Sequence, residues 1–205
     1  MGVLISIGMV LIITVGLAAT LLARLIRQSS ELALRLETEA THDGLTGLPN
    51  RRLLLQWLPK LMDRATRQGA SAAVFFLDLD GFKKINDDLG HDIGDEVLKI
   101  AASRLGSVLR ESDFLARYGG DEFAIVVGEV SSHEQLERLV QIVATPLSPE
   151  MKGYGVGVSV GIAIFPEHGD EVADVIKAAD GAMYQAKRGG KGRCHFAGQD
   201  ALPQP

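Results

Sequence analysis

The chain opens with a long apolar stretch. No charged side chain occurs between Gly2 and Ala23, and most of these residues are Leu, Ile, Val or small. As a helix that rises 1.5 Å per residue, about 22 residues cover roughly 33 Å, which matches the hydrocarbon core of a bilayer. The pattern therefore predicts a transmembrane anchor helix at residues 1–23.

A cleaved signal peptide and a buried helix of a soluble protein are the alternatives for this segment. A signal peptide usually combines a basic start, an apolar stretch of ~7 to 15 residues and a small-residue cleavage site. This stretch is longer, no Lys or Arg precedes it, and no convincing cleavage site follows it, which favours an uncleaved anchor. Because Arg24 and Arg27 follow directly, the positive-inside rule places the C-terminal part in the cytoplasm.

Strong helix formers continue from residue 24 to residue 40, so the membrane helix is expected to extend as a stalk. Leu25, Leu32 and Leu36 are spaced by seven and four, which suits packing against a second copy but does not require a coiled coil. A solvated linker helix is the alternative. Gly and Pro in THDGLTGLPN, residues 41–50, then break the helical pattern and mark a domain boundary.

Helical and strand patterns alternate beyond residue 41. Asn50 can cap a helix that runs to about Arg67, and an apolar β-type run at residues 72–77 ends in acidic residues. Further helices are expected at about 82–89, 93–109, 133–144 and 171–187, with a strand at 156–165 and a short last strand. The segment at 114–127 is expected to form a tight hairpin that turns at Gly119 and Gly120. This alternation indicates an α/β fold, a central sheet with helices packed on it, over residues 41–197, followed by a flexible tail at 198–205.

The composition excludes several classes of protein. A hydrophobic content of 46% excludes an intrinsically disordered chain, and Cys194, the only cysteine, excludes a disulfide-built scaffold. A net charge of −5 and a pI near 5.5, with one basic cluster at residues 187–193, argue against binding of nucleic acid polymers. Any nucleotide ligand is therefore expected to be small.

Acidic side chains follow two of the predicted strands. Asp78 and Asp80 end the apolar run, and Asp121 and Glu122 lie at the exposed tip of the hairpin. If the strands are neighbours, the carboxylates meet at one edge of the sheet, and their repulsion favours a divalent cation, most often Mg²⁺ where phosphates share the site. Either motif alone is typical of an ordinary turn, whereas the two together indicate a site.

The segment RYGGDEF, residues 117–123, resembles the signature of the GGDEF family, the diguanylate cyclases that join two GTP into cyclic di-GMP. DGLTGLPNRR, DLDGFKKINDDLGHDIGD, SVGIAIFP and ADGAMYQAK are similar to the same family in order and spacing, over about residues 41–196. The resemblance implies a palm-like central β-sheet with flanking helices, related to nucleotidyl cyclases and polymerase palms. It also implies a homodimer, because one domain holds one GTP and the product needs two.

The resemblance assigns roles to individual residues. The implied metal ligands, for Mg²⁺ or alternatively Mn²⁺, are Asp78, the carbonyl of Leu79, Asp121 and Glu122, and Asp121 and Glu122 are also the implied catalytic acids. The implied substrate-binding residues are Asn86 and Asp95 for guanine, Gly119 and Gly120 for close approach of the nucleotide, Lys187 and Lys191 for the triphosphate, and Phe82 and Lys83. Arg110 and Asp113 match an RxxD product site for feedback inhibition by cyclic di-GMP.

These residue types suit the implied chemistry. Attack of a 3′-hydroxyl on an α-phosphate depends on positioning and on neutralised phosphate charge, which metal ions and lysines supply. A carboxylate such as Asp95 can accept from guanine N1–H and N2–H₂ together, and adenine has no such pair of donors. Gly192 stands where the family often has Asn, a difference expected to affect the shape of the loop rather than the chemistry.

The sequence thus predicts a single-pass diguanylate cyclase in the bacterial cytoplasmic membrane, with its enzymatic domain in the cytoplasm. One alternative is a GGDEF module without activity that binds GTP or cyclic di-GMP as a receptor. A structural adaptor tethered to the membrane is another. The acids and lysines implied by the resemblance are all present, which favours the enzyme.

Overall fold

The computed structural model describes residues 2–130, 136, 139–140 and 156–199. The chain divides into two compact units, Met1–Ala40 and Thr41–Pro205. Most of the helix predicted at 133–144 and of the tail predicted at 198–205 lies outside the described residues.

The first unit is helical. Helix α1, Gly2–Thr41, runs without a break through both the apolar segment and the predicted stalk, so the expected continuation of the helix is confirmed. The side chains of the stalk leucines Leu25, Leu32 and Leu36 are exposed. When only the residues whose side chains the structure describes are counted, no helix is long and apolar enough to cross a membrane. Most side chains of the predicted anchor, residues 1–23, lie outside that set.

The second unit is built on a five-stranded sheet in the order β2-β3-β1-β4-β5. Its strands are β1 Ser71–Asp80, β2 Phe114–Gly119, β3 Glu122–Val130, β4 Gly157–Phe165 and β5 Cys194–Phe196. Neighbouring strands are antiparallel except for β4 and β5, which are parallel. Strand β1 is central and covered on both faces, which explains why its sequence is a continuous apolar run rather than an alternating one.

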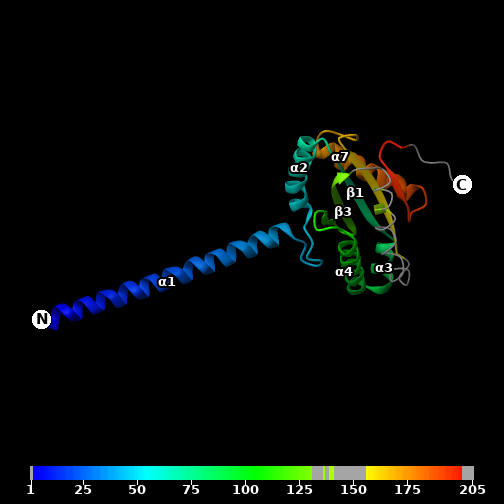
Figure 1. Cartoon of the computed structure of the whole chain (residues 1–205). Helices are drawn as coiled ribbons and strands as arrows, with labels where there is room; N and C mark the ends of the chain where they lie inside the picture. The colour runs from blue at the N-terminus through cyan, green and yellow to red at the C-terminus, as the bar shows by residue number, and fades with distance from the viewer. Residues whose placement is uncertain (1, 131–135, 137–138, 141–155, 200–205) are drawn as a thin grey trace. The chain divides into compact units, whose positions relative to one another are not determined.

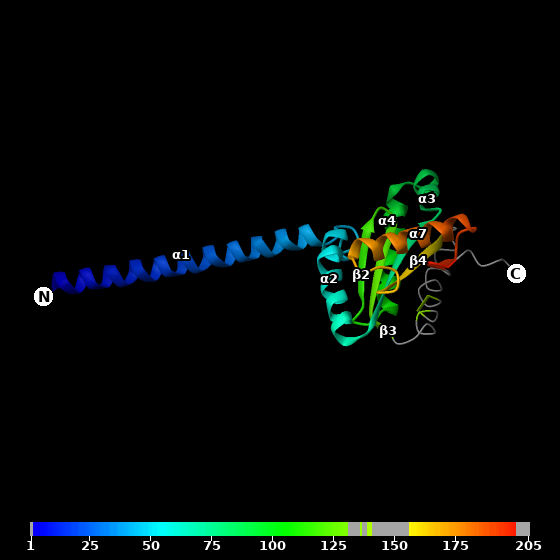
Figure 2. The same cartoon turned by 90° about the horizontal axis from the view of Figure 1, so that it is seen from above.

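Helices cover both faces of this sheet (Figures 1 and 2). Helices α2, Arg51–Gln68, and α7, Val172–Arg188, lie on one face, and α3, Phe82–Leu89, and α4, His91–Val108, lie on the other. Alternate residues of β1 divide between the two cores: Val74 and Phe76 pack with α2 and α7, whereas Phe75 and Leu77 pack with α4. The predicted α/β fold, a central sheet with flanking helices, is confirmed.

Local signals in the sequence fix several element ends. Asn50 caps α2 as predicted, because its side-chain oxygen accepts from the backbone N–H of Leu53 at 3.1 Å. The β2–β3 hairpin turns at Gly120, whose φ of 52° lies in the left-handed region that glycine adopts without strain.

In β5, burial raises the pKa of the Cys194 thiol to about 11.

Helix α7 approaches β4 closely at Gly161. A Cβ at this position would overlap the carbonyl oxygen of Ala179 and the backbone nitrogen of Met183. Glycine therefore lets the helix backbone rest directly on the sheet. This contact lies about one helical turn before Lys187 on α7.

Candidate active site

Polar side chains gather on one face of the sheet at the end of β1. Asp78 pairs in register with Glu122 on β3 and with Ser159 on β4. Because side chains alternate along a strand, Asp78 and Asp80 lie on the same face as Phe76, the face covered by α2 and α7. Both aspartates belong to β1, and each is only 7% exposed, so both are buried.

A lysine from α7 neutralises part of this acidic charge. Lys187, in the last turn of α7, places its Nζ 2.6 Å from Oδ2 of Asp78. The close seat of α7 on β4 brings this ammonium to the end of β1. Lys187, predicted to bind the triphosphate, is therefore an immediate neighbour of the predicted metal ligand Asp78.

The acids of the hairpin are half-buried, so the expectation that they are exposed is wrong. The reason is the register of β3 against β1, which sets Glu122 directly across from Asp78. Burial raises the pKa of Asp121 and of Glu122, and the negative charge of Asp78 raises both further, while Lys187 acts in the opposite direction. The site thus concentrates negative charge that Lys187, together with Arg117 near Asp121, offsets only in part.

The carboxylates of Asp78, Asp121 and Glu122 are donors that fit a hard divalent cation. Within the described part of the chain, no three His, Cys, Asp or Glu side chains form a ready-made metal cluster. Mg²⁺, however, is usually held by one or two carboxylates together with substrate phosphates rather than by a cage of protein ligands. Asp78 and Glu122, opposite each other on adjacent strands, supply such a pair of carboxylates.

An ion pair that sequence reasoning missed holds the hairpin in place. Arg117 Nη1 lies 3.0 Å from both carboxylate oxygens of Asp43, and Arg117 Nε and Nη2 donate to the carbonyl of Gly120 at 3.0 and 2.7 Å. Asp43 also accepts from the backbone N–H and the hydroxyl of Thr46 at 2.8 and 2.6 Å. Burial works to raise the pKa of Asp43, but these hydrogen bonds and Arg117 lower it overall.

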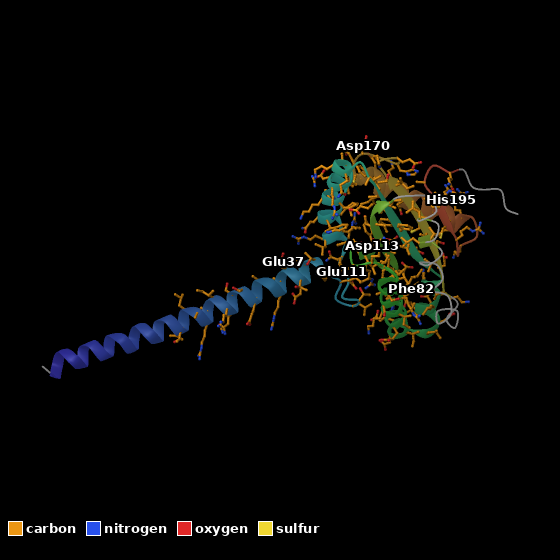
Figure 3. All side chains as sticks on the ribbon, viewed as in Figure 1. Glu37, Phe82, Glu111, Asp113, Asp170 and His195 are labelled. Carbon is orange, nitrogen blue, oxygen red and sulfur yellow. The ribbon has the colours of Figure 1, made fainter. Side chains whose placement is uncertain are left out.

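The predicted guanine-binding residues lie on α3 and α4, on the other side of the sheet. The side-chain oxygen of Asn86 is buried without a hydrogen-bond partner among the described residues. It rests on Gly94, where a Cβ would overlap it, and the exposed Asp95 comes next along α4. The structure therefore places Asn86 against Gly94, the residue that precedes Asp95. Phe82, labelled in Figure 3, begins α3. It packs on the core beside Asn86 and Gly94.

The remaining predicted substrate residues are open to solvent. Lys83 and Lys191 are exposed, as are Gly119 and Gly120, where an added Cβ would meet nothing within 4 Å. Gly192 has a φ of 59°, a conformation that glycine and asparagine adopt more readily than other residues. This agrees with the expectation that the exchange of Asn for Gly concerns the shape of the loop.

Arg110 and Asp113, the predicted product site, close a turn between α4 and β2. Figure 3 labels Asp113 in this turn. The backbone N–H of Arg110 donates to Oδ2 of Asp113 at 2.9 Å, and the N–H of Asp113 donates to the carbonyl of Arg110 at 2.9 Å. The Arg110 side chain is exposed and borders a cavity of about 520 Å³ between α2 and β3.

Tyr118 and Phe123 flank the acidic residues and contribute to packing. Phe123 is fully buried, and the ring of Tyr118 contacts the ring of Phe76 edge-on.

The fold and this arrangement of acids and lysines define a domain of the nucleotidyl cyclase type. Residues 40–193 match the family model described as diguanylate cyclase, GGDEF domain, and the chain belongs to this family.

The curated proteins that resemble this chain are named for different activities. Diguanylate cyclase TpbB of Pseudomonas aeruginosa is 42% identical over an alignment of 180 residues that covers 85% of this chain and 40% of TpbB. The response regulator PleD of Caulobacter vibrioides is 40% identical over 74% of this chain and 35% of PleD. Cyclic di-GMP phosphodiesterase NbdA of P. aeruginosa is 36% identical over 87% of this chain and 23% of NbdA. The chain spans less than half the length of these relatives.

Solved structures show the same fold. The GGDEF domain of TpbB superposes with a TM-score of 0.70 at 37% identity, covering 76% of this chain and 99% of that one. The coiled coil and GGDEF domain of DgcB from Caulobacter crescentus, in complex with c-di-GMP, gives a TM-score of 0.72 at 30% identity, covering 86% of this chain and 99% of that one.

Proposed function

We propose that this protein is a diguanylate cyclase that condenses two GTP into cyclic di-GMP and releases two pyrophosphates. The observation that carries the proposal is the pairing of Asp78 with Glu122 across β1 and β3, with the Lys187 ammonium against Asp78. These groups lie on a domain of the diguanylate cyclase family. A receptor that only binds nucleotide can lose part of this set of acids and lysines, whereas the whole set is present in this chain.

The acidic residues hold the metal and handle the proton. Asp78, Asp121, Glu122 and the carbonyl of Leu79 would bind Mg²⁺ or, alternatively, Mn²⁺. The bound ion would neutralise phosphate charge as the α-phosphate is attacked. Glu122 would also accept the proton of the attacking 3′-hydroxyl.

The other residues bind and orient the nucleotide. Asn86 and Asp95 read the guanine, and the open backbone at Gly119 and Gly120 lets the ribose and phosphates approach. Lys187 and Lys191 pair with the triphosphate, and Lys83 and Phe82 contribute from the start of α3. One domain supplies one such set, so two copies must face each other to join two GTP.

The apolar segment at residues 1–23 acts as a single membrane anchor in this proposal, with the cyclase domain on the cytoplasmic side. Its support is the absence of any charged residue between Gly2 and Ala23 and the two arginines that follow. The cytoplasm is also the compartment that contains GTP.

Product binding at Arg110 and Asp113 would provide feedback. Five residue steps of strand separate Asp113 from Tyr118, so this turn lies on the order of 17 Å from the hairpin tip. Product bound there acts at a distance from the acids, and its inhibition is therefore allosteric. The DgcB structure, solved with c-di-GMP, shows that a related chain binds this nucleotide.

The test is to incubate the purified full chain in detergent with GTP and Mg²⁺ and to identify the product by mass spectrometry. Cyclic di-GMP and two equivalents of pyrophosphate are expected, and a chelator should stop their formation. Binding of GTP or cyclic di-GMP without turnover would instead establish the receptor.

A further inference from the structure

Asp80 is a buried carboxylate that the proposed reaction does not use. It ends β1, is 7% exposed, and lies on the same sheet face as Asp78. Its contacts are different, because the Ser159 hydroxyl lies 2.9 Å from both of its oxygens and the backbone N–H of Gly192 donates to Oδ2 at 2.9 Å. A buried carboxylate without such donors would be strongly unfavourable, so these bonds account for its burial.

The Gly192 N–H belongs to the loop of residues 189–193 that follows α7. Gly190, Lys191 and Gly192 have φ angles of 121°, 63° and 59°. A lysine seldom adopts a positive φ, so its neighbours must hold it there. The backbone bonds from Gly190 N–H to Lys187 and from Lys191 N–H to Ala186 are long, at 3.4 and 3.3 Å.

Two bonds of 2.9 Å hold the ends of the loop: Gly189 N–H donates to the Gln185 carbonyl, and Val160 N–H donates to the Arg193 carbonyl. In the middle of the loop, the bond from Gly192 N–H to Asp80, also 2.9 Å, is shorter than the other two bonds there. Gly157, at the start of strand β4, lies beside both Asp80 and Gly192. A Cβ at Gly157 would lie 3.3 Å from Oδ2 of Asp80 and 3.7 Å from the Cα of Gly192. The loop is thus packed against the end of β1 and the start of β4.

We propose that Asp80 is a positioning residue that fixes the loop of residues 189–193 and, through it, directs the Lys191 ammonium at the triphosphate of GTP. The inference rests on the proposed function in taking GTP as the ligand of Lys191. Asp80 acts as a hydrogen-bond acceptor for Gly192. Its negative charge is not what the loop requires.

This distinction makes Asp80→Asn the informative conservative variant. The amide oxygen of an asparagine can accept from the Gly192 N–H. Its NH₂ group can donate to the Ser159 hydroxyl, which rotates to accept. Asp80→Ala instead leaves the Gly192 N–H without its acceptor. A residue that acts through its negative charge would lose that role in both variants.

The experiment measures kcat and KM for GTP on the full chain in detergent. It also measures binding of 3′-deoxy-GTP, which lacks the attacking hydroxyl, and of GMP, which lacks the β- and γ-phosphates. Asp80→Ala should raise KM and weaken 3′-deoxy-GTP binding about tenfold, with kcat within about threefold and GMP binding unchanged, as expected from one lost hydrogen bond. Asp80→Asn should stay within about twofold of the wild type. Asp80→Ala combined with Lys191→Ala should be no weaker than Lys191→Ala alone, because both act through one ammonium.

Ser159→Ala is the matched control. It removes the second partner of Asp80 but leaves the bond to the loop, so thermal stability should fall while KM stays near the wild-type value. If Asp80→Ala does not fold, Asp80→Ser takes its place, since a serine side chain is too short to reach Gly192.

Three results would overturn the inference: equal losses in Asp80→Asn and Asp80→Ala, an unchanged KM in Asp80→Ala, or additive effects with Lys191→Ala. A wild-type chain that makes no cyclic di-GMP refutes the proposed function, and the 3′-deoxy-GTP comparison then still decides the role of Asp80. A wild type that fails to bind 3′-deoxy-GTP refutes both.

Discussion

Replacement of Arg117 tests how the hairpin with the acidic residues is held. The Arg117 guanidinium joins Asp43 to the Gly120 carbonyl through contacts of 2.7 to 3.0 Å, and the two side chains of the ion pair are 14% and 22% exposed. Arg117→Lys keeps the positive charge but loses the planar fork that reaches both partners at once. Arg117→Ala also leaves Asp43 partly buried without its cation.

The magnitude follows from the bonds lost. A hydrogen bond to a charged group contributes about 1.5 to 3 kcal/mol, and partial exposure brings this pair towards the lower end. Arg117→Lys should therefore lower the free energy of unfolding by about 1 kcal/mol, and Arg117→Ala by about 2 to 3 kcal/mol. Because the hairpin tip carries Asp121, kcat should fall at least about tenfold in Arg117→Lys, more than this small loss of stability would cause.

The assay is urea denaturation followed by circular dichroism, together with initial rates of cyclic di-GMP formation. Arg64→Lys is the control, since Arg64 pairs with Glu129 at 2.9 Å but both side chains are at least 60% exposed. Such a surface pair contributes about 0 to 1 kcal/mol, so little change is expected. If Arg117→Lys kept full stability and turnover, the proposed role of the ion pair would be wrong.

The pH dependence adds a check with a defined sign. The pKa of Asp43 is lower in the folded chain than its ordinary value of 3.8. Its contribution to stability is therefore present above pH 3.8 and is lost as the pH falls through the lower, folded-state pKa. The difference in the free energy of unfolding between wild type and Arg117→Ala should shrink in that acidic range. A difference that grew on acidification would contradict this assignment.

Three further predictions concern catalysis, the membrane and feedback. Asp121→Asn combined with Glu122→Gln should reduce cyclic di-GMP formation by roughly two orders of magnitude or more while the domain stays folded, and undiminished turnover would overturn the metal assignment. The mature chain should retain residues 1–23 and sediment with membranes, and a mature chain that begins beyond Ala23 would exclude the anchor. Arg110→Ala should relieve inhibition by added cyclic di-GMP with little change in the initial rate, and equal inhibition of wild type and variant would exclude the product site.

The sequence predicts local structure well because each element carries its own signal. The cap at Asn50, the tight turn at Gly120 and the apolar run of β1 depend on neighbouring residues, and all three were predicted. Contacts between distant residues depend on the order of the strands, which no local pattern specifies. The bonds of Asp80 to Ser159 and Gly192 span 79 and 112 residues. By local pattern alone, Asp78 and Asp80 therefore look equivalent, although they have different partners in the fold.

The single cysteine has a practical consequence for work on this chain. At neutral pH, a thiol with a pKa of about 11 exists as thiolate in roughly one molecule in ten thousand, and maleimides react with the thiolate. Cys194 is also half-buried in β5. A cysteine introduced at the exposed Tyr184 on α7 should therefore be labelled selectively without removing the native one. Energy transfer between two fluorophores at that position would then report directly how two copies come together.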